Sequence, residues 1–212
     1  MTTNKLVATL CGELFGLHVQ AYPRYGSEKK GLPTTYYLTI AEAPIHQHAE
    51  LHGVEFVPVH DVSAFHHGNP LAGLVDGGTL FLAGSMTDPQ EIWAALPSAA
   101  RAEILGRGIR VTAMDTAALA ERHAPRPDLV VRMQGVALVG VFLRVAPFAA
   151  RMELEGEQLF EALRSVLKRY FGKRGSAVVA ANLAVVREAY ESLIDVTGAI
   201  GAPLAEPQEV PA

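Results

Sequence analysis

Short β-branched or aromatic runs alternate with helical segments through the first half of the chain, and this alternation restricts the possible folds most. Strands are predicted at residues 17–22, 34–40, 54–59, 79–82 and 109–113. Strands that alternate with helices are joined by crossovers, which make a parallel sheet. The pattern therefore predicts an α/β, Rossmann-like fold, with a mostly parallel sheet, helices on both faces and a helical C-terminal part.

Helical spacing of apolar residues predicts helices that begin near residues 2, 89, 98, 116, 129, 156 and 176. Asp88-Pro89-Gln90-Glu91 is a strong helix start, with Asp as the N-cap and Pro at the first helical position. Residues 60–78 are expected to be irregular, with a turn at Asp76-Gly77-Gly78. One domain is predicted over residues 1–197, followed by a disordered or extended tail over 198–212.

The chain opens directly into a helix, whereas a doubly wound domain normally begins with a strand. Loss of a central strand would leave unpaired backbone groups and a gap in the core. Either the sheet is organised differently, or the natural chain has residues upstream of Met1. We favour the second explanation, so that the first strand is missing from this sequence.

The composition of the chain argues against a nucleic-acid partner and leaves protein partners possible. The net charge of −4 argues against nucleic acid, which requires a basic surface. The Lys/Arg run at residues 164–174 is interpreted as the solvated side of a helix. Charged residues make up only 19% of the chain, which fits either a well-filled core or a surface covered by partner chains.

The single cysteine, Cys11, is predicted to lie in the core. One thiol excludes an intrachain disulfide, and it cannot by itself hold an iron–sulfur cluster, which takes about four thiolates. The most apolar run, residues 136–148, contains Arg144 and is too short to span a bilayer. No signal peptide is recognised, so we expect a cytoplasmic chain without a membrane partner.

The loop Tyr25-Gly26-Ser27-Glu28-Lys29-Lys30-Gly31 lies between two predicted strands, where α/β proteins place functional loops. Its ammonium groups and glycines, with Arg24 beside them, suit an anion such as phosphate or carboxylate. The alternative is an ordinary charged surface turn.

Two other groups of residues are less specific. His46, His48, His52, His60, His66 and His67 are close in sequence and could supply a metal, but a compositional bias on surface loops explains them better. The segment from Phe65 to Leu71 is interpreted as a tight connection rather than a partner contact. No complete nucleotide fingerprint or catalytic constellation is visible, so no catalytic residue is assigned.

The order of these features resembles the gamma subunit, or gamma domain, of the pyruvate and 2-oxoacid:ferredoxin oxidoreductases. The resemblance covers about residues 2–190. It is carried by the loop Tyr25–Gly31, by Pro44-Ile45, by Arg132-Met133-Gln134-Gly135, and by Tyr170-Phe171-Gly172-Lys173-Arg174-Gly175 with Asn182. The family's opening strand and Gly-Gly-Gln-Gly turn are absent here, and Gln134 stands near a position that is often Asn in relatives.

This resemblance implies a subunit of an assembly that converts a 2-oxoacid and CoA to acyl-CoA, CO₂ and reducing equivalents. Thiamine diphosphate, Mg and [4Fe-4S] clusters are expected in the alpha, beta and delta-type chains, so that this chain alone holds no cofactor and is not catalytic. The acceptor would be ferredoxin or a flavin subunit. Pyruvate, 2-oxoglutarate, branched-chain and aromatic oxoacids are all compatible with the resemblance.

The resemblance further implies that CoA is contacted by Arg24, Tyr25, Gly26, Glu28, Lys29, Lys30 and Gln134. The runner-up hypothesis is a stand-alone α/β nucleotide-binding enzyme or module. A metal-binding domain that uses the histidines is a third and weaker hypothesis.

Overall fold

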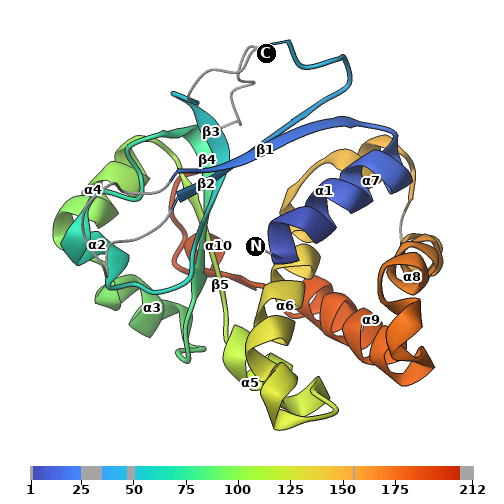
Figure 1. The fold of residues 1–212 in the computed structure, drawn as a ribbon. Helices are drawn as coiled ribbons and strands as arrows, with labels where there is room; N and C mark the ends of the chain where they lie inside the picture. Colours follow the sequence, from blue (N-terminus) through green and yellow to red (C-terminus); the bar gives the residue numbers. More distant parts are fainter. Residues whose placement is uncertain (1, 25–34, 47–50, 155, 206–212) are drawn as a thin grey trace. The chain divides into compact units, whose positions relative to one another are not determined.

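A computed structural model describes residues 2–24, 35–46, 51–154 and 156–205 (Figure 1). The chain divides into two compact units. The helical unit comprises residues 1–22, 36–47 and 116–192, and the sheet unit comprises residues 23–35, 48–115 and 193–212. The predicted α/β class is confirmed, because a mostly parallel sheet and many helices make up the described chain.

The sheet unit contains a four-stranded sheet in the order β3-β4-β5-β6. Its parallel strands are β3 (Val54–Val59), β4 (Leu74–Ala83) and β5 (Arg110–Met114). A two-residue strand, β6 (Ile194–Asp195), adds antiparallel to β5. The mostly parallel sheet is therefore as predicted, whereas β6 was not foreseen because two residues carry no recognisable alternation.

Helices α2 (Ala64–His67), α3 (Pro89–Ala95) and α4 (Ser98–Gly106) lie along one face of this sheet (Figure 1). As predicted, Asp88 caps α3, since its Oδ1 accepts hydrogen bonds from the backbone N–H groups of Gln90 (2.8 Å) and Glu91 (3.0 Å). Leu80 and Val111 from the strands pack with Ile92 and Ile104 from the helices in one apolar core. This core fixes the crossover from β4 to β5.

The prediction of an irregular segment over residues 60–78 was wrong in two places. Residues 64–67 form α2, and β4 begins at Leu74 rather than at Thr79. The register of β3 on β4 shifts between Val54 and Phe56, so the Asp76-Gly77-Gly78 stretch is a bulge within β4 and not a turn that precedes it.

Two glycines make this bulge possible. Gly77 has φ +72°, in the left-handed region that favours glycine. A Cβ on Gly78 would lie 2.9 Å from the carbonyl oxygen of Val75 and 3.1 Å from that of Glu55. The sequence reads as a turn because the same glycine-rich composition serves turns and bulges.

The sheet unit ends with α10 (Val196–Ala199), whose N-cap is Asp195. Thr197 is fully buried, and its hydroxyl accepts a hydrogen bond from the backbone N–H of Val111 at 3.1 Å. The N–H of Ala205 donates to the carbonyl of Gly108, so the chain stays attached to the sheet unit as far as residue 205. The domain boundary proposed at residue 197 stays a prediction, and residues 206–212 lie outside the described ranges.

The helical unit is built from α1 (Thr2–Phe15), α5 (Thr116–His123), α6 (Val130–Val145), α7 (Phe148–Arg151), α8 (Gly156–Phe171) and α9 (Ser176–Glu191). Two 3₁₀ turns, η1 (Pro127–Leu129) and η2 (Gly172–Arg174), precede α6 and α9. β1 (His18–Arg24) and β2 (Thr35–Ala41) form a separate antiparallel pair. Apart from α7, each helix was predicted within a few residues of its observed bounds.

Helices α6 and α9 form the centre of this unit, and α1, α5 and α8 pack around them. Cys11 of α1 is fully buried, as predicted, and burial raises the pKa of its thiol to about 12. Within the described ranges, no helix is both long and apolar enough to cross a lipid bilayer.

Glu188 of α9 joins α5 to this centre. Its carboxylate accepts a hydrogen bond from Arg122 at 2.5 Å and pairs with Nε2 of His123, also at 2.5 Å. These partners, His123 first, hold the pKa of Glu188 below its ordinary value of 4.5. The interaction of Glu188 with Arg122 and His123 therefore stabilises the fold above pH 4.5. This contribution to stability is lost as the pH falls through the lowered pKa of Glu188.

We expect Glu188→Gln to lower the free energy of unfolding at pH 7 by roughly 1 kcal/mol, because the network is partly exposed. The difference from the unchanged chain should shrink as the pH falls below 4.5, where the carboxylate becomes protonated. Guanidinium unfolding at a series of pH values measures this. A difference that stays constant down to pH 3 would contradict the assignment.

Candidate functional site

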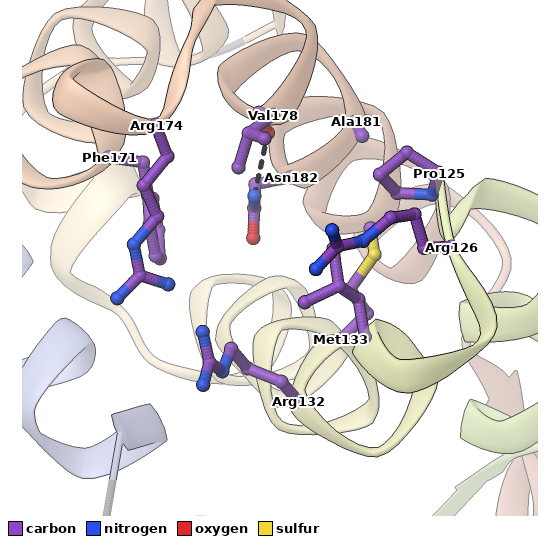
Figure 2. Close-up of a pocket in the computed structure, with 10 residues that line it drawn as sticks. Pro125, Arg126, Arg132, Met133, Phe171, Arg174, Val178, Ala181 and Asn182 are labelled. Atoms are coloured by element: carbon purple, nitrogen blue, oxygen red, sulfur yellow. Dashed lines mark hydrogen bonds between the residues drawn. The ribbon is translucent and has the colours of Figure 1, made fainter.

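A cavity of about 450 Å³ opens on the helical unit where the start of α6 meets η2 and α9 (Figure 2). Its walls combine cationic side chains, apolar groups and one buried amide. The lining residues are Pro125, Arg126, Leu129, Arg132, Met133, Phe171, Arg174, Val178, Ala181 and Asn182.

Two local features of the chain place the arginines around this cavity. Pro127 begins η1 and leads into α6, so that Arg126 precedes the helix and Arg132 lies in its first turns. On the opposite wall, Gly175 has φ +100° and separates η2 from α9, which leaves Arg174 beside the end of α8. A residue other than glycine would be strained at position 175.

The three guanidinium groups differ in their partners. Arg126 is paired with Asp128 at 2.9 Å, so its charge is partly neutralised. Arg174 lies over the ring of Phe171, with its Cζ 5.9 Å from the ring centroid. Within the described parts of the chain, neither Arg132 nor Arg174 has a carboxylate partner.

Asn182 is the buried polar group of the site, with 5% of its surface exposed. Its Nδ2 donates to the backbone carbonyl of Val178 at 2.6 Å, one turn earlier in α9. This bond fixes the amide, and Figure 2 shows its oxygen directed into the cavity, toward the space that the guanidinium groups of Arg132 and Arg174 also face. The cavity thus offers two cationic donors and one fixed acceptor.

The residues predicted to contact CoA fall mostly outside the described ranges. Tyr25, Gly26, Glu28, Lys29 and Lys30 all lie there, and Arg24 is described only as the last residue of β1. Gln134 is half-buried on α6, beside Met133, and does not line the cavity. The predicted set therefore stays a prediction.

The sequence analysis did not predict the cavity lined by Arg126, Arg132 and Arg174, here called the arginine cavity. Arg174 was interpreted, with the Lys/Arg run at residues 164–174, as part of a solvated helix side; its side chain is exposed, but it belongs to η2 rather than to an α-helix and lines the cavity. Arg126, between Pro125 and Pro127, was not assigned a role from the sequence. An asparagine at a buried position of the apolar helix α9 was the one signal available, because a buried amide needs partners for both of its polar atoms.

The clustered histidines lie partly inside the described ranges. His46, His52, His60, His66 and His67 are described, and no set of three or more His, Cys, Asp or Glu side chains is grouped to hold a metal in the described part of the chain. His48 lies outside it. Within the segment from Phe65 to Leu71, residues 65–67 belong to α2, Phe65 packs on the sheet core, and the Asn69 side chain accepts from the N–H of Leu71. The interpretation as a tight connection rather than a partner contact stays a prediction.

These features define an open α/β domain with a cationic cavity on its helical part. The chain belongs to the pyruvate ferredoxin/flavodoxin oxidoreductase family, whose sequence model matches residues 1–192. The resemblance inferred from the residues is thereby confirmed at the level of the family.

Curated relatives are distant and much longer than this chain. A pyruvate dehydrogenase [NADP(+)] of Cryptosporidium parvum is 27% identical over 199 residues, which is 93% of this chain but 10% of the relative. A pyruvate-flavodoxin oxidoreductase of Trichormus variabilis is 26% identical over 191 residues, which is 90% of this chain and 15% of the relative. The chain thus spans a small part of the proteins it matches in sequence.

Two solved structures share the fold. Pyruvate oxidoreductase subunit PORC of Thermotoga maritima superposes with a TM-score of 0.59 at 20% identity, covering 91% of this chain and 88% of that subunit. The 2-oxoglutarate:ferredoxin oxidoreductase of Magnetococcus marinus gives a TM-score of 0.58 at 16% identity, covering 99% of this chain and 31% of that one. The fold therefore occurs both as a separate subunit and within a longer chain.

Proposed function

We propose that this chain is the gamma-type subunit of a multi-chain, thiamine-diphosphate-dependent 2-oxoacid:acceptor oxidoreductase. The family match over residues 1–192 carries the proposal. The fold likeness agrees with the proposal, because this chain covers 88% of a Thermotoga maritima protein that is itself a subunit of a pyruvate oxidoreductase. The reaction is that of the family: a 2-oxoacid and CoA give an acyl-CoA and CO₂, and two electrons pass to ferredoxin or another acceptor.

The reaction centre belongs to other chains of the proposed complex. Cys11 is the one cysteine, it is buried, and a [4Fe-4S] cluster needs about four thiolates. Thiamine diphosphate, Mg and the clusters are accordingly assigned to alpha, beta and delta-type subunits. The part left to this chain is to pack on that core and to help bind CoA.

The proposed CoA contacts are the cationic loop residues Arg24, Lys29 and Lys30. Ammonium and guanidinium groups recognise phosphate oxygens, and the glycines of the loop allow backbone N–H groups to approach an anion. Glu28 would hold the loop by pairing with one of these cations. The Magnetococcus marinus fold relative was solved with coenzyme A and succinyl-CoA bound, which supports CoA as the anion of interest.

We expect the double substitution Lys29→Ala and Lys30→Ala to raise the KM for CoA in the assembled complex by at least tenfold, with the KM for the 2-oxoacid unchanged. Each lost ammonium–phosphate contact is worth about 1.5–3 kcal/mol. Steady-state kinetics with CoA as the varied substrate measures this. Lys168→Ala, an exposed change on α8, is the control, and an unaltered KM for CoA in the double variant would remove the loop from the proposal.

A further inference from the structure

The residues that line the arginine cavity are separate in sequence from the CoA loop, the proposed CoA-binding residues 24–31. The combination of cationic, apolar and amide groups in the cavity is specific enough to indicate a ligand. Arg132 and Arg174 come from different elements, yet both guanidinium groups face the same space (Figure 2). Two like charges directed at one place repel each other unless an anion lies between them. Within the described residues no carboxylate of the chain takes that position.

Asn182 gives the cavity an additional feature that a basic surface patch lacks. Its side chain is almost fully buried and held by the bond to Val178, so its oxygen is presented at a fixed point. A fixed amide oxygen accepts a hydrogen bond from an N–H or O–H group. An amide oxygen is also a suitable acceptor for a guanidinium N–H.

The remaining walls are apolar. Leu129, Met133, Phe171, Val178 and Ala181 line the cavity beneath the arginines. The volume of about 450 Å³ lies within the range of about 300–1,000 Å³ that is typical of small-molecule sites. Inorganic phosphate would contact the cationic rim and leave these apolar walls unfilled.

We propose that this cavity binds an organic phosphate: a small molecule with a phosphate group between Arg132 and Arg174 and an apolar or aromatic part against Phe171 and Met133. Guanidinium groups match phosphate oxygens in geometry as well as charge. Arg126, already paired with Asp128, contributes less to affinity than the other two arginines. This inference does not rest on the proposed function, because every residue it uses lies outside the CoA loop.

The test is calorimetric titration of the full 212-residue chain with phenyl phosphate, inorganic phosphate and phenol, at low and at physiological salt. Phenyl phosphate should bind at least tenfold more tightly than either fragment, because it alone uses both the cationic rim and the apolar wall. The substitutions Arg132→Gln and Arg174→Gln should each weaken phenyl phosphate binding about tenfold. Both side chains are exposed, so these variants are expected to fold.

Two further variants separate site binding from general electrostatics. Arg164→Gln removes an exposed charge on α8 that does not line the cavity, and it should leave the affinity unchanged. Asn182→Asp keeps the shape of the side chain but places a negative charge in the cavity, and it should abolish binding. Thermal melting of this variant distinguishes lost binding from lost fold.

The proposal is overturned if phenyl phosphate binds no more tightly than inorganic phosphate. It is equally overturned if Arg164→Gln weakens binding as much as Arg132→Gln and Arg174→Gln do. Either result would assign the arginines to a diffuse basic surface, such as one that contacts an acidic segment of a partner subunit. Failure of this test would leave the KM experiment on Lys29 and Lys30 unaffected.

Discussion

Replacement of Gly140 by alanine is expected to destabilise the helical unit by about 3 kcal/mol, although alanine is the better helix former. A Cβ at this position would overlap the carbonyl oxygen of Val186 and lie 2.7 Å from the Cβ of Ala189. Atoms cannot remain at these separations, and the nearest of them belongs to the backbone of α9. The substitution therefore forces α6 and α9 apart along the central contact of the unit.

Gly12→Ala is the matched control for this prediction. Gly12 lies within α1 of the same unit, is exposed, and has its nearest contact for a new Cβ at 3.7 Å, an ordinary van der Waals distance. Alanine should stabilise that helix by up to about 1 kcal/mol. Guanidinium unfolding followed by far-UV circular dichroism measures both variants. If both glycines respond alike, close packing of α6 on α9 is not what Gly140 provides.

In the sheet unit, Ile104→Ala is expected to cost about 3 kcal/mol of unfolding free energy. Ile104 is fully buried on α4 and belongs to the apolar core beneath β4 and β5. Truncation removes the transfer free energy of the lost methyl and methylene groups and leaves a cavity between helix and sheet. Ile104 shares this core with strand residues and with Ile92 of α3, which limits how far the site can collapse.

Leu105, the next residue on the same helix, supplies the control because 40% of its surface is exposed. Leu105→Ala should cost less than about 1 kcal/mol. The single tryptophan, Trp93, packs against the same core, so its fluorescence reports unfolding of the sheet unit directly. Equal losses for the two variants would contradict the core as described.

The elements that sequence predicted best carry local signals. Asp88-Pro89 specifies the start of α3 through a cap and a fixed φ, and both are present in the structure. The run at 54–59 was predicted with the observed bounds because it is mostly apolar and rich in valine, follows Gly53 and is followed by His60-Asp61. Such signals act within a few residues and do not depend on the rest of the fold.

The elements that were missed depend on contacts distant in sequence. β6 is a strand only because Ile194 and Asp195 pair with Ala113 and Thr112 of β5. The start of β4 was obscured by a glycine bulge that only the partner strand β3 defines. A single sequence contains no local pattern for either contact.

The two candidate sites also differ in whether a local sequence pattern reveals them. The loop Tyr25–Gly31 proposed to bind CoA is contiguous, so its cations form a short motif that is visible in the sequence, and it lies outside the described ranges. The arginine cavity joins residues 125–133 to residues 171–182 through the packing of α6 against α9. The sequence alone therefore does not show that Arg132 and Arg174 lie at one cavity.

Purification of the tagged chain from its native source, without denaturant, tests the central proposal most directly. We expect it to co-purify with larger subunits that show the visible absorption of iron–sulfur clusters. The assembly should oxidise a 2-oxoacid in a CoA-dependent reaction, and that activity should be lost when this chain is removed. A chain that elutes alone and colourless, with 2-oxoacid oxidation continuing in its absence, would contradict the assignment as a gamma-type subunit.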